Sequence, residues 1–169
     1  EIVAFTNLKT LIYQNEDTNY TAPLPPEITQ LPALEALRTT TLSEEIFELT
    51  QLKSLYLFIE HPKDLALLAK HGLGNFSELE TLTLFNSSPE GKLVVEGLQR
   101  LKNLRDVTLF QPSQQVIDDI LALEELEAFT LLYAKSDRRM SFAKTSGLRK
   151  LSLINSKLTI PSFNEIAKY

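Results

Sequence analysis

The chain has 169 residues, 43% hydrophobic and 23% charged, a balance typical of one globular domain with a sizeable core. It has no run of about 18 apolar residues, so no transmembrane helix is expected, and no cysteine, which excludes disulfide scaffolds, thiolate zinc sites and cysteine nucleophiles. The net charge is −5, but residues 1–133 sum to −11 and residues 134–169 to +6. This distribution argues against general nucleic-acid binding; it either steers a partner toward the basic end or is only an uneven solvated surface.

A repeated pattern organises the whole chain. Seven segments fit most positions of L-x-x-L-x-x-L-x-L, and they are residues 5–13, 31–39, 49–57, 76–84, 101–109, 123–131 and 145–153. Their third apolar positions are Leu11, Leu37, Leu55, Leu82, Val107, Phe129 and Leu151. The closing L-x-L of each segment alternates as a β-strand does. One such unit cannot bury its leucines alone, so the pattern predicts parallel strands stacked into a solenoid.

The connections between these strands are predicted to differ. Residues 23–31 carry three prolines and should be extended or turn-rich. Residues 62–72, 92–101 and 114–123 show apolar residues three or four apart, which predicts short helices. The glycines of HGLGN (71–75) are interpreted as the stop of the first helix rather than a phosphate loop.

Two stretches resemble the leucine-rich repeat family: LRKLSLINSKL (148–158) and LPPEITQLPALEALRT (24–39), the second in the form common in bacterial and plant members. The resemblance extends over nearly the whole chain. It implies an α/β leucine-rich repeat solenoid, a right-handed β-α superhelix of about seven repeats. Parallel strands would line the concave side of a curved sheet, and helices or irregular crossovers the outside. Domains of this family most often bind proteins.

The sequence departs from the family at the position where an asparagine usually closes each turn. The residues there are Glu16, Leu42, Glu60, Ser87, Pro112, Ala134 and Ser156. Only Ser87 and Ser156 have side chains that could bond the turn's backbone groups. Less uniform turns and an irregular arc are therefore expected.

One column of residues on the solvent side of the strands is unexpectedly apolar. Just after the last leucine of each unit, the chain carries Gln14, Thr40, Phe58, Phe85, Phe110, Leu132 and Ile154. Five successive apolar members should form one stripe, which Tyr133 could extend sideways. The stripe is either an exposed partner-binding surface, a spine folded into the core beyond the strand ends, or a half-buried row covering the strand edge.

A basic segment provides a second candidate site. Residues 133–141, YAKSDRRMS, are predicted to form a loop at one rim, with Lys135, Arg138 and Arg139 close together. Such a loop could hold a carboxylate-rich segment or a phosphate, or it could simply be solvated.

No catalytic constellation is visible. His61 and His71 lack metal-binding spacing, Ser87 lacks a nucleophile-elbow context, and Asp118 and Asp119 are expected on a solvated helix face. We therefore expect no enzyme activity, no metal and no cofactor, and neither nucleic-acid binding nor membrane insertion.

The chain is expected to form a single domain over residues 1–169. It begins at Glu1 without methionine, its first unit lacks a polar cap, and residues 162–169 resemble the start of another crossover. These features suggest a piece of a longer protein, or ends covered by self-association. The sequence leaves open whether this soluble protein is cytoplasmic or secreted.

The resulting prediction is a non-catalytic, protein-binding module. Its predicted contact residues are Tyr56, Phe58, Phe85, Phe110, Leu132 and Ile154, with Arg138 and Arg139 as a charged rim. Two alternatives remain at this stage: the recognition arm of a larger bacterial effector or enzyme, and a self-assembling structural protein.

Overall fold

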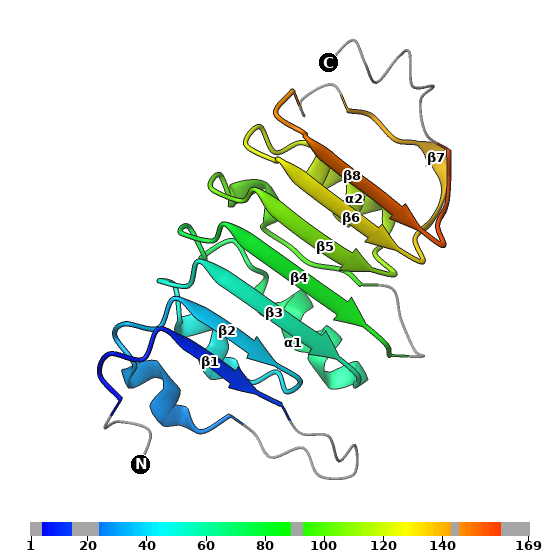
Figure 1. The fold of residues 1–169 in the computed structure, drawn as a ribbon. Coiled ribbons are helices and arrows are strands. Elements are labelled where there is room, and N and C mark those ends of the chain that lie inside the picture. The colour runs from blue at the N-terminus through cyan, green and yellow to red at the C-terminus, as the bar shows by residue number, and fades with distance from the viewer. Residues whose placement is uncertain (1–4, 15–23, 89–92, 143–145, 160–169) are drawn as a thin grey trace.

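The structure, a computed structural model, describes residues 5–14, 24–88, 93–142 and 146–159. Within them, seven parallel strands lie side by side in chain order as one open sheet (Figure 1). They are β1 (Thr10–Tyr13), β2 (Ala36–Thr39), β3 (Ser54–Ile59), β4 (Thr81–Asn86), β5 (Asp106–Phe110), β6 (Ala128–Leu132) and β8 (Lys150–Ile154). The fold is the predicted α/β leucine-rich repeat solenoid.

The register of the sheet follows the sequence repeat position by position. All seven residues at the third apolar position are register partners: Leu11, Leu37, Leu55, Leu82, Val107, Phe129 and Leu151. This agreement confirms the repeat, because a one-residue slip would move every leucine to the opposite face of its strand.

The crossovers lie on one side of the sheet, as the positions of α1 and α2 behind the strands show (Figure 1). In the described residues they contain the 3₁₀ helices η2 (Pro26–Gln30), η3 (Glu44–Glu48) and η4 (Leu98–Arg100), and the α-helices α1 (Pro62–His71) and α2 (Gln114–Leu121). We call the other side of the main sheet the open face.

Two of the predicted helices are confirmed, and local sequence explains their ends. Helix α1 begins at Pro62, where proline has no N–H to leave unpaired. It stops at Gly72, which has φ 63° and donates its N–H to the Leu68 carbonyl at 2.8 Å. Helix α2 is capped by Ser113, whose hydroxyl accepts from the Val116 N–H at 3.4 Å.

The prediction of a helix over residues 92–101 is wrong. Leu93 instead forms an isolated bridge with Pro112, and only the single turn η4 follows. Gly97 interrupts the segment with φ 82°. A Cβ built there would lie 2.7 Å from the Gly74 nitrogen, so the neighbouring crossover requires glycine at this position.

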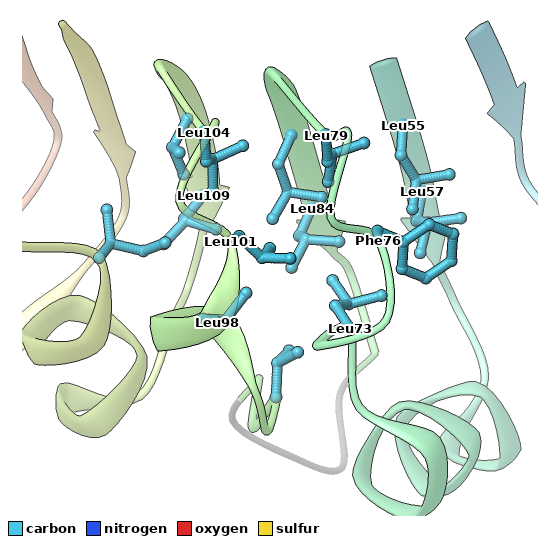
Figure 2. Packing of buried hydrophobic residues seen from close by; sticks show 14 of the residues in the cluster. Leu55, Leu57, Leu73, Phe76, Leu79, Leu84, Leu98, Leu101, Leu104 and Leu109 are labelled. Atoms are coloured by element: carbon cyan, nitrogen blue, oxygen red, sulfur yellow. The ribbon is translucent and has the colours of Figure 1, made fainter. Parts of the chain in front are cut away.

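The core fills the space between the sheet and the crossovers. Figure 2 shows Leu55, Leu57, Leu84 and Leu109 from three successive strands packed together with Leu73, Phe76, Leu98 and Leu101 from the crossovers. Every one of these side chains is at least 99% buried. Burial of each such side chain contributes roughly 1.5–3 kcal/mol, so the stacked leucines are the main source of stability.

A row of alternating charges precedes the strands. Successive backbone hydrogen bonds align Lys9, Glu35, Lys53, Glu80, Arg105, Glu127 and Arg149. Neighbouring residues of this row form three ion pairs: Lys9–Glu35 at 3.1 Å, Lys53–Glu35 at 3.6 Å and Arg105–Glu127 at 3.5 Å. The Lys9 hydrogen bond, with the charge of Lys53, lowers the pKa of Glu35. Exposed pairs of this kind contribute little individually to stability.

Candidate functional site

Five of the predicted contact residues occupy one row across five neighbouring strands of the open face. Their register partnerships run Phe58–Phe85, Phe85–Phe110, Phe110–Leu132 and Leu132–Ile154. Strand β3 continues to Ile59 and β4 to Asn86, so neither strand ends before its phenylalanine. We call these five residues, together with Tyr133, the apolar row.

The phenylalanine rings stack on one another across the strands. The ring centroids of Phe58 and Phe85 are 4.7 Å apart with planes at 9°, and those of Phe85 and Phe110 are 4.1 Å apart with planes at 25°. Stacking follows from the strand spacing of about 4.8 Å, which is close to the contact distance of two rings. Both faces of the Phe85 ring are therefore covered by its neighbours, which leaves mainly its edge for solvent.

The stacked rings are half-buried, and this is the intermediate of the three arrangements that the sequence allowed. Phe58, Phe85, Phe110 and Leu132 are each partly accessible, whereas the leucines that alternate with them are buried. Ile154 at the end of the row is 45% exposed. From Phe58 to Ile154 the row crosses four strand gaps, roughly 19 Å.

Tyr133 joins the row through an unusual backbone conformation. It follows the end of β6 with φ 52°, a left-handed conformation that is uncommon for a bulky residue. Its ring centroid lies 5.1 Å from that of Phe110, and the side chain is 45% exposed. Gln111 and Asn155, after β5 and β8, have the same sign of φ, so successive units turn alike at this edge. Backbone strain of this kind is frequent at functional sites.

Tyr56, the remaining aromatic residue of the prediction, lies on the same face two residues before Phe58. The guanidinium carbon of Arg38 from the neighbouring strand is 4.3 Å from the centroid of the Tyr56 ring, a cation–π contact. Arg38 and Tyr56 are register partners in one column of open-face residues, and no role was predicted for Arg38 from the sequence. The same column continues in register as Thr83, Thr108 and Thr130, so small polar residues border the apolar row.

Polar side chains close the turns beyond the row, as predicted for two serines. Ser87 donates its hydroxyl to the Ile59 carbonyl at 3.3 Å, and Ser156 accepts from the Ala134 N–H at 3.1 Å. The sequence interpretation missed Asn86, which is fully buried and accepts from the Ser88 N–H at 3.1 Å. Asn86 lies one residue before the position where the repeat places its asparagine.

The predicted basic loop is a strand instead, because a later segment pairs with it. Strand β7 (Lys135–Arg139) and strand β9 (Lys157–Thr159) form a separate two-stranded parallel sheet. Arg138 and Arg139 both belong to β7, but their side chains lie outside the described part of the structure. Their proposed role as a charged rim therefore stays a prediction.

The two histidines lie at opposite ends of α1. At a helix rise of about 1.5 Å per residue, they are roughly 15 Å apart. His71 stacks on Phe47 with centroids 4.5 Å apart, and its Nε2 lies 3.7 Å from a Glu44 oxygen. Nearby, a surface cavity of about 390 Å³ is lined by Glu96, Asp119 and other crossover residues. Among the described residues, no group of three or more potential metal ligands is found, and no helix there is long and apolar enough to cross a membrane.

Among the described residues, Asp64 at the start of α1 is the one carboxylate that is buried. Only 1% of its surface is exposed, and its Oδ1 has no hydrogen-bond partner. Burial raises the pKa of Asp64, although the charge of Lys63 and the backbone of His61 oppose this shift. A carboxyl whose folded pKa exceeds its unfolded value destabilises the fold as pH rises through that folded pKa.

Replacing Asp64 with asparagine is therefore expected to stabilise the protein at pH 7. Asparagine is also polar, so the gain comes only from removing the buried charge, and it should shrink as pH falls toward the unfolded pKa of about 3.9. Urea unfolding at several pH values measures it. Asp118→Asn, on the exposed side of α2, separates the effect of burial from the loss of one charge. A destabilisation independent of pH would contradict this account.

Comparison with known proteins adds a distant structural likeness. No family model matches the sequence, and no curated protein matches it. Among solved structures, a crystal structure of an internalin (inlF) from Listeria monocytogenes is similar over 98% of this chain, at 16% sequence identity and a TM-score of 0.43. The match covers 66% of that chain, so this protein spans just under two thirds of its length.

Proposed function

We propose that this solenoid is a protein-binding module that contacts its partner through the apolar row of the open face. The supporting observation is the continuous stack of Phe58, Phe85 and Phe110, extended by Tyr133, on a face that none of the described crossover elements covers. Contiguous accessible apolar patches are typical of interaction sites, and aromatic residues are enriched at the centres of interfaces.

The stack also favours binding through its rigidity. Ordering a free side chain at an interface costs about 0.5–1.5 kcal/mol. The ring of Phe85 lies between two others at 4.7 and 4.1 Å, so most of its rotamer freedom is already lost before a partner arrives. Burial of the accessible ring edges would then add apolar area at little further entropic cost.

The test is capture of a protein from the native source. The natural chain should retain a partner that a variant with Phe85→Asp and Phe110→Asp does not retain. Assembly that depends on concentration and is lost in the same variant would identify the partner as a second copy of this chain. If the double variant changes neither capture nor assembly, the proposal is wrong.

A further inference from the structure

We propose that the partner is a protein segment in which apolar side chains are followed by acidic residues, with the carboxylates held by Lys135 and Lys157. This inference rests on the proposed function and adds the chemistry and the direction of the bound segment. It is carried by a pair of lysines beside one end of the apolar row.

Lys135 and Lys157 are direct register partners in the small parallel sheet of β7 and β9. The Lys157 N–H donates to the Ala134 carbonyl at 2.8 Å, which fixes their alignment. Residues opposite one another in neighbouring strands point to the same side, and both lysines are exposed. Like charges placed in this way repel, and no described carboxylate forms an ion pair with either lysine.

The lysine pair lies close to the apolar row along the chain. Lys135 follows Tyr133 by two residues, and Lys157 follows Ile154 by three. At about 3.3–3.6 Å per extended residue, their Cα atoms are at most roughly 7 and 11 Å from those residues. Figure 1 shows β7 just beyond the carboxyl ends of β6 and β8. A segment covering Leu132 and Ile154 can therefore reach both ammonium groups.

The opposite end of the row carries charges of both signs. Phe58, the first aromatic residue of the row, is followed two residues later by Glu60, at the end of β3. The row is thus bordered near β3 by Glu60 and the Arg38 guanidinium, and beyond β8 by two ammonium groups. The lysine pair, with no described carboxylate against it, favours a segment whose acidic residues lie over β8.

Two labelled peptides test the proposal by fluorescence anisotropy. Both carry the same apolar core of about six residues, which spans roughly 19 Å when extended, followed by glutamates in one and lysines in the other. The natural chain should bind the glutamate peptide about three- to tenfold more tightly at low salt, the range expected of two exposed ion pairs. The preference should fade in 1 M salt, where the Debye length is about 3 Å.

Two variants separate this inference from the proposed function. Lys135→Glu with Lys157→Glu, both at exposed positions, should reverse the preference between the peptides. Phe85→Thr with Phe110→Thr should weaken the binding of both. Equal binding of the two peptides that still depends on the phenylalanines overturns the acidic-segment inference and leaves the proposed function standing. Binding that does not depend on the phenylalanines, or no binding at all, overturns both.

Discussion

Alanine at Gly97 is expected to lower the free energy of unfolding by about 2–5 kcal/mol. The left-handed conformation of this residue costs roughly 1–2 kcal/mol for an L-amino acid. The new Cβ would also lie 2.7 and 2.8 Å from backbone atoms of Gly74, and such overpacking costs about 1–3 kcal/mol. Backbone in the neighbouring crossover has to move, because no flexible side chain is there to yield. Chemical denaturation measures the change.

Gly147 provides the matched control for this substitution. A Cβ built on Gly147 has only ordinary contacts, 3.6 Å to the Leu126 carbonyl oxygen and 3.7 Å to that of Glu124. Gly147→Ala should therefore change stability far less than Gly97→Ala. Equal effects of the two substitutions would contradict the close packing of the crossovers at Gly74.

Replacing Phe85 and Phe110 together with aspartate is expected to weaken partner binding by roughly a thousandfold. The estimate assumes that each ring contributes as a central aromatic residue of an interface does, where truncation typically costs 2 kcal/mol or more. The charges would also stand next to Phe58 and Tyr133, so any partner surface would have to desolvate them. Affinity for the captured partner is the quantity to measure.

Two further variants show whether such a loss concerns the surface or the fold. Ala69→Glu with Gln99→Glu adds two charges at exposed positions on the crossover side and should leave binding unchanged. Phe85→Thr with Phe110→Thr removes the rings but keeps residues that favour strands. Thermal unfolding of each variant shows that the chain is still folded. Undiminished affinity of the threonine variant would exclude the rings from the interface.

The repeat in the sequence was sufficient to predict the sheet. Its two-residue alternation places each leucine on one face, and seven copies leave one consistent register, so Leu82 and its partners were predictable. The α-helices α1 and α2 were predictable from local sequence, because their caps and apolar spacing lie within a few residues of one another.

The wrong predictions depend on contacts between distant segments. Residues 92–101 have helical spacing, but Gly97 is held in its conformation by packing against Gly74, more than twenty residues away. Residues 133–141 resemble a loop until β9 supplies the other strand. The half-buried state of Phe85, one of three arrangements that the sequence left open, likewise arises from rings on two other strands.

Some features were present in the sequence but were not recognised there. Aligning the units one position earlier would have shown the alternating row that begins with Lys9, Glu35 and Lys53. Lys135 and Lys157 each follow the repeat position held by Ala134 and Ser156, but their pairing was not recognised because residues 133–141 resemble a loop. Arg38 and Tyr56 occupy the same repeat position, so their contact follows from the register of β2 and β3.

Site-specific photocrosslinking tests most directly whether the open face binds the partner. A benzophenone amino acid replaces either Tyr133, 45% exposed beside Phe110, or Ala69, exposed on α1 on the crossover side. We expect the captured partner to crosslink from position 133 and not from position 69. Crosslinking from position 69 alone would place the partner on the crossovers and contradict the assignment of the apolar row as the binding surface.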